Sequence, residues 1–468
     1  MATETTGFKQ TFGLFDATMI VAGSMIGSGI FIVSADISRN VGSAGWLIMV
    51  WLITGFMTLT AAVSYGELSG MFPKAGGQYV YLKEAYNPLV GFLYGWSFFA
   101  VIQTGTIAAV GVAFSKFAAY LIPGISEDNI LFTIGSFNIS AAQLVSIVLV
   151  IFLTWFNTRG TQGGKMVQTF FTSAKLLSLF GLIIFGLFMF KSDVFSANWT
   201  DAWHLQKMAK DGTFTQYAGL AFLGAVAAAM VGSVFSSDAW NNVTFIAGEI
   251  KNPKRNIGLS LFLGTLIVTI IYVSINIVYT GVLPLQEIAS AEKDRVAVAA
   301  SQVIFGGIGT KIIAVMIMIS TFGCNNGLIL AGARVYHTMA KDGLFFKKTG
   351  ELNRNAVPAY GLWIQCLVAS LLCLSGKYGD LLDYVSFVVV IFYVLTIAGI
   401  FILRKKRPDL ERPYKAFGYP VLPALYILMG LAFCTLLLIY KPQFTWPGLG
   451  LVLIGIPIYY VAVGKKKA

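Results

Sequence analysis

Residues 23–29 read Gly-Ser-Met-Ile-Gly-Ser-Gly and lie inside the first long apolar stretch of the chain. A helix that only crosses a bilayer does not need three glycines and two serines within seven residues. Gly23 and Gly27 have the GxxxG spacing of a close helix–helix contact. Ser28 and Gly29 extend the pattern beyond what packing requires, and glycine makes unwinding of the backbone cheap. The stretch predicts either a close helix contact or a break in the helix, and we favour the break.

A break at this depth would have a chemical use. An unwound segment leaves backbone N–H groups free beside a helix N-terminus, which suits a carboxylate. Non-helical backbone within a membrane is tolerated only where it lines a cavity. The motif therefore indicates a cavity that binds a small anionic group.

The composition is that of a membrane protein. Of the 468 residues, 57% are hydrophobic and 12% are charged, whereas soluble proteins have about 45–50% apolar and about 25% charged residues. At roughly 20 apolar residues per crossing, the chain has room for about a dozen spans with short loops. The net charge of +12 fits basic cytoplasmic loops better than nucleic-acid binding. The four cysteines lie in apolar runs, so they indicate no disulfide framework and no metal cluster.

Apolar runs predict twelve membrane-spanning helices, near residues 14–34, 43–71, 88–121, 141–157, 166–190, 217–248, 257–281, 299–333, 359–375, 380–403, 420–440 and 447–463. With the N-terminus inside, 22 of the 33 Lys and Arg residues fall in inner loops, eight in outer loops and three within spans. This bias supports the count and predicts that both termini are cytoplasmic. The start of the chain does not have the pattern of a cleavable signal peptide.

The sixth span contains a second interruption. Residues 234–242 read Val-Phe-Ser-Ser-Asp-Ala-Trp-Asn-Asn. An aspartate near the membrane centre is costly unless it is paired or hydrated, so Asp238 is a candidate functional residue. Asp238 could instead cap the second half of a broken helix. Both interpretations require the break.

Two interrupted helices at matching positions predict an inverted-repeat transporter with a site at the membrane midplane. The expected fold is therefore all-α, with twelve transmembrane helices arranged as five, five and a final pair in one domain, 1–468. The first repeat would be 1–190, the second 217–403 and the terminal pair 420–463.

Lys175 is a further anomaly, because it follows Lys165 by ten residues, about 15 Å along a helix. That depth is too great for easy snorkelling, so the ammonium needs acceptor oxygens, which the unwound part of the first span could supply. Lys175 could alternatively face a polar crevice. In the eighth span, residues 320–327 read Ser-Thr-Phe-Gly-Cys-Asn-Asn-Gly; they would either reach the same cavity or form hydrogen bonds between helices.

The run from Val21 to Phe31, VAGSMIGSGIF, resembles the first-helix signature of the L-amino-acid transporter family of the amino acid–polyamine–organocation superfamily. Residues 235–241 together with 248–256, GEIKNPKRN, resemble the sixth-helix signature and its following loop. Residues 73–79, PKAGGQY, and the segment from Arg407 to Tyr414 match as well. The resemblance covers nearly the whole chain.

The resemblance implies a LeuT-type fold that moves amino acids by alternating access, with site residues taken from the family pattern. The backbone of Ile26, Gly27, Ser28 and Gly29 would hold the substrate carboxylate. Phe235, Ser236 and Asp238 would hold the amino group, with Phe235 as an outer gate. Lys175 matches a fifth-helix lysine of sodium-independent members, and Asn326 matches a pocket-lining asparagine.

Two departures from the family bear on partners and selectivity. Animal light chains of this family carry a cysteine after the third helix that bridges to a glycoprotein heavy chain. Residues 123–138 contain no cysteine, so we expect a standalone prokaryotic-type protein, monomeric or weakly homo-oligomeric. Asp238 occupies a position that is aspartate in members accepting cationic substrates, which puts strict neutral selectivity in doubt. Gly258 replaces the proline expected at the start of the seventh helix.

We therefore predict a sodium-independent exchanger of neutral L-amino acids, with Ala, Ser or Thr favoured, in the cytoplasmic membrane. The alternative is a proton-coupled or cationic amino acid transporter. The sequence shows no rings of pore-lining charge and no filter repeat, so a channel is not indicated. Two histidines outside the predicted spans give neither a nucleophile–base pair nor a metal site, so we expect no enzyme activity and no cofactor.

Overall fold

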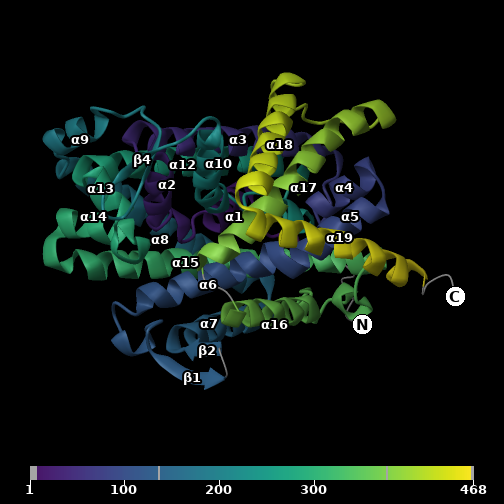
Figure 1. Cartoon of the computed structure of the whole chain (residues 1–468). Helices are drawn as coiled ribbons and strands as arrows, with labels where there is room; N and C mark the ends of the chain where they lie inside the picture. The colour runs from purple at the N-terminus through teal and green to yellow at the C-terminus, as the bar shows by residue number, and fades with distance from the viewer. Residues whose placement is uncertain (1–7, 135–136, 376–377, 465–468) are drawn as a thin grey trace.

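The computed structural model describes residues 8–134, 137–375 and 378–464. Helices make up almost all of it (Figure 1). Within the described residues, nine helical segments are long and apolar enough to cross a membrane: Ala44–Met71, Pro88–Ala118, Ala141–Thr158, Gln162–Phe188, Pro253–Val282, Val296–Lys341, Leu381–Lys406, Val421–Tyr440 and Pro442–Val461. Shorter apolar helices cover Leu14–Met25, Ala221–Ser236 and Ala359–Leu374. The chain is thus a multi-pass membrane protein.

Both predicted breaks are confirmed. Helix α1 (Leu14–Met25) stops before Ile26, and the chain resumes as the short turn η1 (Gly29–Phe31) and helix α2 (Ser34–Val41). Helix α10 (Ala221–Ser236) stops in the same way and is followed by α11 (Asn242–Phe245) and η4 (Ala247–Glu249). Ile26 has extended backbone angles, and Ala239 has a positive φ of 62°. Either conformation ends the helical hydrogen-bond pattern.

The long uninterrupted helices are α3 (Ala44–Met71), α7 (Ala141–Thr158), α8 (Thr161–Phe188), α12 (Pro253–Val282), α17 (Tyr378–Lys406), α18 (Val421–Tyr440) and α19 (Pro442–Gly464), and the shorter α16 covers Ala359–Ser375. The third predicted span consists of α5 (Pro88–Ser97), the π-turn η2 (Phe98–Ile102) and α6 (Gln103–Ala118). A π-turn inside a helix often marks a functional position.

One predicted boundary is wrong. The span expected at residues 299–333 consists of two helices, α14 (Val296–Phe305) and α15 (Gly309–Lys341), joined by the turn η6 (Gly306–Ile308). Gly306 has φ +65°, a left-handed conformation that glycine adopts without strain. The apolar composition continues across this turn, so hydropathy gave no sign of it. His337, one of the two histidines outside the predicted spans, lies within α15 and is buried.

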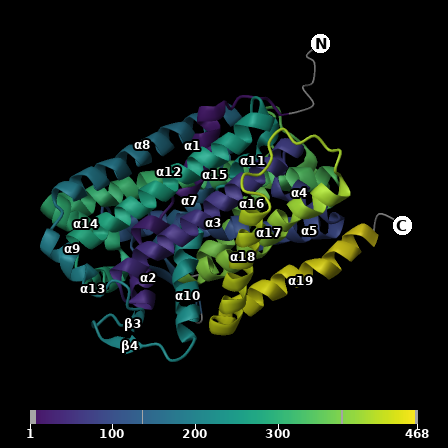
Figure 2. The same cartoon turned by 90° about the horizontal axis from the view of Figure 1, so that it is seen from above.

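The remaining elements are small. They are α4 (Gln78–Ala85), η3 (Pro123–Ile125), α9 (Ser192–Trp199), α13 (Leu285–Ala289), η5 (Glu292–Asp294), η7 (Lys347–Gly350), the hairpin β1–β2 (Ile130–Ile134, Phe137–Ser140) and the hairpin β3–β4 (Gln206–Met208, Phe214–Gln216). Both hairpins are antiparallel. They lie outside the helical bundle, while α18 and α19 lie along one side of it (Figures 1 and 2).

Small residues allow the helices near the breaks to approach closely. Helices α3 and α12 run side by side, and Gly55 faces Thr269 while Gly66 faces Gly258 across their contact. Gly264 of α12 lies against Val21 of α1. This packing fixes α1 and α12 relative to each other and so positions the first break.

Candidate functional site

The two breaks lie directly against each other. A Cβ added to Gly29 would overlap the Ser236 hydroxyl and side chain, so only glycine fits at this point. The hydroxyl of Tyr272, on α12, donates a hydrogen bond to the carbonyl of Met25 at 3.1 Å and to that of Ser236 at 2.8 Å. One side chain thus connects the C-terminal ends of both half-helices α1 and α10.

The first break exposes backbone donors. The N–H groups of Gly27 and Gly29 have no acceptor within the described residues. They lie between the end of α1 and the start of η1. Unpaired amides in a buried segment are costly without a partner, and an anionic group bound there would satisfy them.

Carbonyl oxygens at the end of α1 and in the same break bind Lys175. The Lys175 ammonium, 1% exposed on α8, donates to the carbonyls of Gly23 at 2.6 Å and Ile26 at 2.7 Å. It also lies 3.3 Å from the carbonyl of Ser320 on α15. The expected contact between Lys175 and the unwound part of the first span is therefore present, and the side chain is buried.

Span 8 contributes to the same cluster of contacts. The Ser320 hydroxyl donates to the carbonyls of Ile26 at 3.2 Å and Gly27 at 3.0 Å. Cys324 donates its thiol proton to the Ser24 carbonyl at 3.0 Å. The polar patch of span 8 therefore holds the break of α1 in place through hydrogen bonds between helices.

Gly23 has the packing role that its GxxxG spacing suggests. A Cβ at Gly23 would overlap the side chains of Gln168 and Thr172 on α8. At Gly27, the nearest atom to such a Cβ would be the Cys324 sulfur at 3.2 Å. The two interpretations of the motif therefore apply to different residues, since Gly23 makes the close contact and Gly27 lies in the break.

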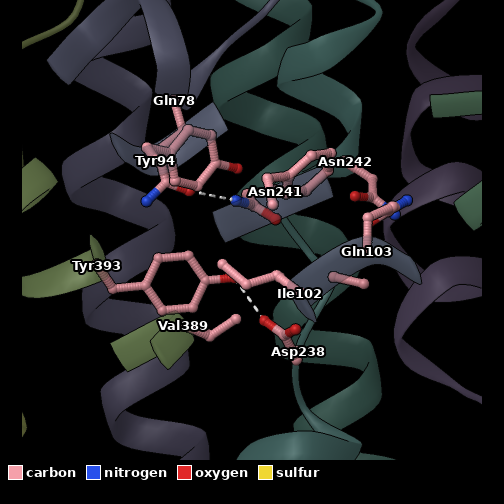
Figure 3. Close-up of a pocket in the computed structure, with 11 residues that line it drawn as sticks. Gln78, Tyr94, Ile102, Gln103, Asp238, Asn241, Asn242, Val389 and Tyr393 are labelled. Atoms are coloured by element: carbon pink, nitrogen blue, oxygen red, sulfur yellow. Dashed lines mark hydrogen bonds between the residues drawn. The ribbon is translucent and has the colours of Figure 1, made fainter. Parts of the chain in front are cut away.

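Asp238 lies in the second break and is buried, with 7% of its surface exposed. The Tyr393 hydroxyl, on α17, donates to its carboxylate at 2.5 Å (Figure 3). Helix α11 begins after Asn241, three residues further on, and has no side-chain cap. Asp238 is therefore not the N-cap of the second half-helix, and that interpretation is wrong.

A small cavity of about 10 Å³ adjoins Asp238, close to the space that one water molecule needs. Figure 3 shows the hydrogen bond that joins Tyr393 to Asp238 and the one that joins the Gln78 and Asn241 amides, which is 2.8 Å long. Helices α4, α5, α6, α11 and α17, the π-turn η2 and the second break supply its lining, which consists of Gln78, Tyr94, Phe98, Ile102, Gln103, Asp238, Ala239, Asn241, Asn242, Val389 and Tyr393.

Sequence reasoning named only Asp238 among these lining residues. Gln78 and Asn241 were part of recognised motifs, but their pairing, and the bond from Gln78 to Thr396 on α17 at 3.0 Å, depend on the fold. Gln103, Tyr393 and Tyr272 are polar residues within apolar spans. A polar residue in such a span is a weak sequence indication of a site, and it could have identified all three as candidates.

Every sequence candidate other than Asp238 lies outside this cavity lining, Asn326 and Phe235 among them. Asn326 is fully buried, and its amide contacts Asn157 on α7 at 2.9 Å and Gln168 on α8 at 3.2 Å. It therefore takes part in the packing of α7, α8 and α15. Phe235 is buried near the end of α10, one residue before Ser236.

Comparisons with known proteins agree with this geometry. Residues 12–463 match the family model described as amino acid permease. The chain is 31% identical to the serine/threonine exchanger SteT of Bacillus subtilis (strain 168) over the full length of both proteins. It is 30% identical to large neutral amino acids transporter small subunit 2 of Homo sapiens, across 97% of this chain and 81% of that protein. It is 27% identical to Asc-type amino acid transporter 1 of Mus musculus, across 99% and 83%.

The family model spans nearly the whole chain, and the similarity to these transporters is equally extensive. Two broken helices whose ends are joined through the Tyr272 hydroxyl are a feature of transporters with discontinuous helices. The chain therefore belongs to the amino acid permease family, among the L-amino-acid transporters of the amino acid–polyamine–organocation superfamily, and is an amino acid transporter rather than an enzyme.

Proposed function

We propose that this transporter is a sodium-independent exchanger of neutral L-amino acids that works by alternating access. The observation that carries the proposal is the contact of the Lys175 ammonium with carbonyls of the first break and of α15. Carbonyl oxygens at a broken helix are the groups that coordinate Na⁺ in transporters of this architecture. A lysine that occupies them supplies the positive charge permanently and removes the need for the ion.

The proposed architecture is twelve crossings in a LeuT-type arrangement of two inverted five-helix repeats, 1–190 and 217–403, and a terminal pair, 420–463. The twelve long and short apolar helices within the described residues support this count. The breaks open the first and the second group of five, as an inverted repeat requires.

The proposed substrate site lies between the breaks. The unpaired amides of Gly27 and Gly29, with the neighbouring backbone of Ile26 and Ser28, would bind the substrate carboxylate. Phe235, Ser236 and Asp238 would receive the amino group, with Phe235 closing the site from outside. For Asn326, the buried contacts with α7 and α8 favour an indirect role that holds α15 in position.

We propose small substrates such as Ala, Ser and Thr. The support for this preference is the similarity over the full length to a relative named as a serine/threonine exchanger. The cavity beside Asp238, at about 10 Å³, holds no more than one water molecule, so a substrate of any size has to enlarge it.

A second candidate function is transport of cationic amino acids or coupling to protons. It rests on Asp238, whose carboxylate lines the cavity beside Tyr393. A buried carboxylate in a membrane protein can pair with a cationic substrate or take up a proton.

We further propose that the protein acts in the cytoplasmic membrane with both termini inside, and without a disulfide-linked heavy chain. The four cysteines, Cys324, Cys366, Cys373 and Cys434, are free and buried. The 22 to 8 distribution of basic residues between the two sets of loops supports the orientation.

The test is uptake of radiolabelled L-serine into proteoliposomes without sodium and without a pH gradient. Vesicles preloaded with unlabelled L-serine are compared with empty vesicles. Uptake confined to preloaded vesicles establishes exchange, and equal uptake in both overturns exchange in favour of uniport. Uptake that requires an imposed pH gradient, or selective competition by L-lysine, would favour the second candidate.

A further inference from the structure

A second concave region lies at the N-terminal end of α12, apart from the cavity beside Asp238. It is a groove of about 690 Å³ between α3, α12 and the segment joining α17 to α18. We call it the α12 groove; its lining consists of Val63, Lys254, Arg255, Gly258, Leu259, Phe262, Pro413, Tyr414 and Phe417. None of these residues contributes to the cavity beside Asp238.

Glycines shape the floor of the groove. Gly66 of α3 and Gly258 of α12 lie so close that a Cβ on Gly258 would be 3.4 Å from the Cα of Gly66. The Tyr414 ring lies over Gly66, where an added Cβ would approach it to 2.9 Å. Gly258, the residue that replaces the proline expected here, therefore leaves space beside α12 that a larger residue would reduce.

The wall formed by the α17–α18 segment is held in one conformation. Glu67 of α3 is fully buried and accepts two hydrogen bonds from Arg404, at 2.9 and 2.6 Å. It also accepts the backbone N–H of Ala416 at 2.7 Å. Arg412 donates to several carbonyls of the same segment, including those of Leu403 and Arg407. The groove is thus preformed, because its loop wall is anchored on a buried carboxylate.

Charge and apolar surface are separated within the groove. Lys254 and Arg255 are exposed at its rim, at the first turn of α12. Lys254 pairs with Glu411 at 2.7 Å, an ion pair in which both side chains are at least half exposed. The Arg255 guanidinium has neither a hydrogen bond nor an ion pair within the described residues. The walls beyond the rim are apolar, and Phe417 is 73% exposed.

This arrangement matches an amphiphile with an anionic head. The rim lies at the end of a membrane-spanning helix, where phospholipid headgroups meet the protein, and the apolar walls continue along α12 toward the hydrocarbon region. A soluble anion would gain nothing from Leu259, Phe262 and Phe417, whereas an acyl chain would cover them. Basic residues at a helix end attract anionic lipids, by about 1 kcal/mol for each side chain.

We propose that the α12 groove is a binding site for an anionic glycerophospholipid. Its phosphate contacts Arg255 and Lys254, and one acyl chain lies along Leu259, Phe262 and Phe417. This site is separate from the proposed amino acid site and does not depend on which substrate is transported.

The test is native mass spectrometry of the purified full-length protein in detergent. The protein is titrated with phosphatidylglycerol and, separately, with phosphatidylcholine carrying the same palmitoyl and oleoyl chains. We expect phosphatidylglycerol to bind at least about fivefold more tightly, and Arg255→Gln to remove about fivefold of that preference. Lys251→Gln is the matched control, since Lys251 is an exposed basic residue at the same helix end but outside the groove.

A second variant and a second probe separate the two halves of the proposed site. Phe262→Asn is expected to weaken binding of both lipids, with thermal unfolding as the check on folding. sn-Glycerol 3-phosphate, a headgroup without chains, is expected not to displace phosphatidylglycerol. Any of three results would overturn the proposal. The two lipids could bind equally tightly, the preference for phosphatidylglycerol could fall equally in Arg255→Gln and Lys251→Gln, or sn-glycerol 3-phosphate could displace phosphatidylglycerol.

Discussion

At the scale of single residues, Lys175 is the most informative side chain. A buried ammonium is tolerable only where acceptor oxygens replace its water shell. Carbonyls of Gly23, Ile26 and Ser320 fulfil this condition and belong to two other helices. The lysine thereby joins α8, the end of α1 and α15, so a change at this position affects a contact shared by three elements.

Lys175→Ala is expected to reduce exchange of L-serine at least about tenfold, without a gain of sodium dependence. Hydrogen bonds to charged groups contribute about 1.5–3 kcal/mol each, and the variant leaves buried carbonyls without donors. Uptake of radiolabelled L-serine into proteoliposomes, with and without sodium, measures both the rate and the sodium dependence. Lys311→Ala, at an exposed lysine on α15, is the control; wild-type rates in Lys175→Ala would refute the role in place of a cation.

Asp238 and Tyr393 permit a test of selectivity at the same scale. Asp238→Asn keeps an acceptor for the Tyr393 hydroxyl while it removes the charge. If the carboxylate recognises cationic substrates, competition by L-lysine should fall about tenfold while L-serine exchange changes less than about threefold. Competition assays with both amino acids measure the difference, and Tyr393→Phe controls for the loss of the hydrogen bond alone. An unchanged profile would restrict Asp238 to a structural role.

At the scale of elements, the two broken helices depend on each other. Gly29 in the first break packs against Ser236 at the end of α10, and Tyr272 of α12 hydrogen-bonds to both half-helices. The helices therefore cannot move independently at this level without loss of these contacts. This arrangement explains why one span carries a glycine where the other carries a serine.

Gly29→Ala is expected to reduce transport more than tenfold, because the new methyl group would overlap Ser236. Adding Ser236→Gly removes the side chain that it meets and should restore part of the rate. Exchange rates of the single and double variants form the test. Gly124→Ala, where an added Cβ meets nothing within 4 Å, is the control. A fully active Gly29→Ala protein would contradict the close approach of the two breaks.

At the scale of the whole molecule, ion pairs join distant segments at both ends of the bundle. On one side Arg39 of α2 pairs with Asp294 of η5 at 2.7 Å. At the other end Glu249 of η4 pairs with Arg334 of α15 at 2.8 Å, and both side chains are 1% exposed. Both ion pairs are formed in the described structure. In the alternating access proposed above, we expect one of them to separate at a time.

Arg334→Met is expected to lower the free energy of unfolding by about 3–5 kcal/mol, since it leaves Glu249 buried and unpaired. A second substitution, Glu249→Gln, removes that charge and should recover most of the loss. Thermal unfolding of the purified protein in detergent compares the variants. Arg407→Met, which breaks the more exposed pair with Glu84, should change the free energy by less than about 1 kcal/mol. Equal losses in both single variants would contradict the prediction.

Much of the architecture could be predicted from composition and local pattern. Long apolar runs have to be buried in lipid as helices, and clusters of glycine, serine and asparagine within them interrupt the helical pattern. The breaks at residues 26–28 and 237–241 and the multi-pass class followed from these facts alone. The turn at Gly306 was missed because the spans were placed by hydropathy and the flanking residues are apolar, although Gly306, Gly307 and Gly309 fall within four residues.

The hydrogen-bond partners of the site residues could not be predicted from composition and local pattern. Lys175 was expected to need acceptor oxygens because burial of any ammonium imposes that need, whatever the fold. By contrast, the pairings of Asp238 with Tyr393, Gln78 with Asn241 and Asn326 with Asn157 each join side chains more than 150 positions apart. A hydrogen bond depends on distances of about 3 Å, which local pattern does not encode.

The sequence by itself therefore determined the membrane class, the positions of the two breaks and the family, because these depend on hydrophobicity, backbone freedom and short motifs. Only the tertiary structure decided which helices meet at the breaks, how small the cavity beside Asp238 is, and that Glu67 anchors the wall of the α12 groove. These features result from the packing of segments distant in the chain, and the geometry of packing is set by the whole fold rather than by any single stretch.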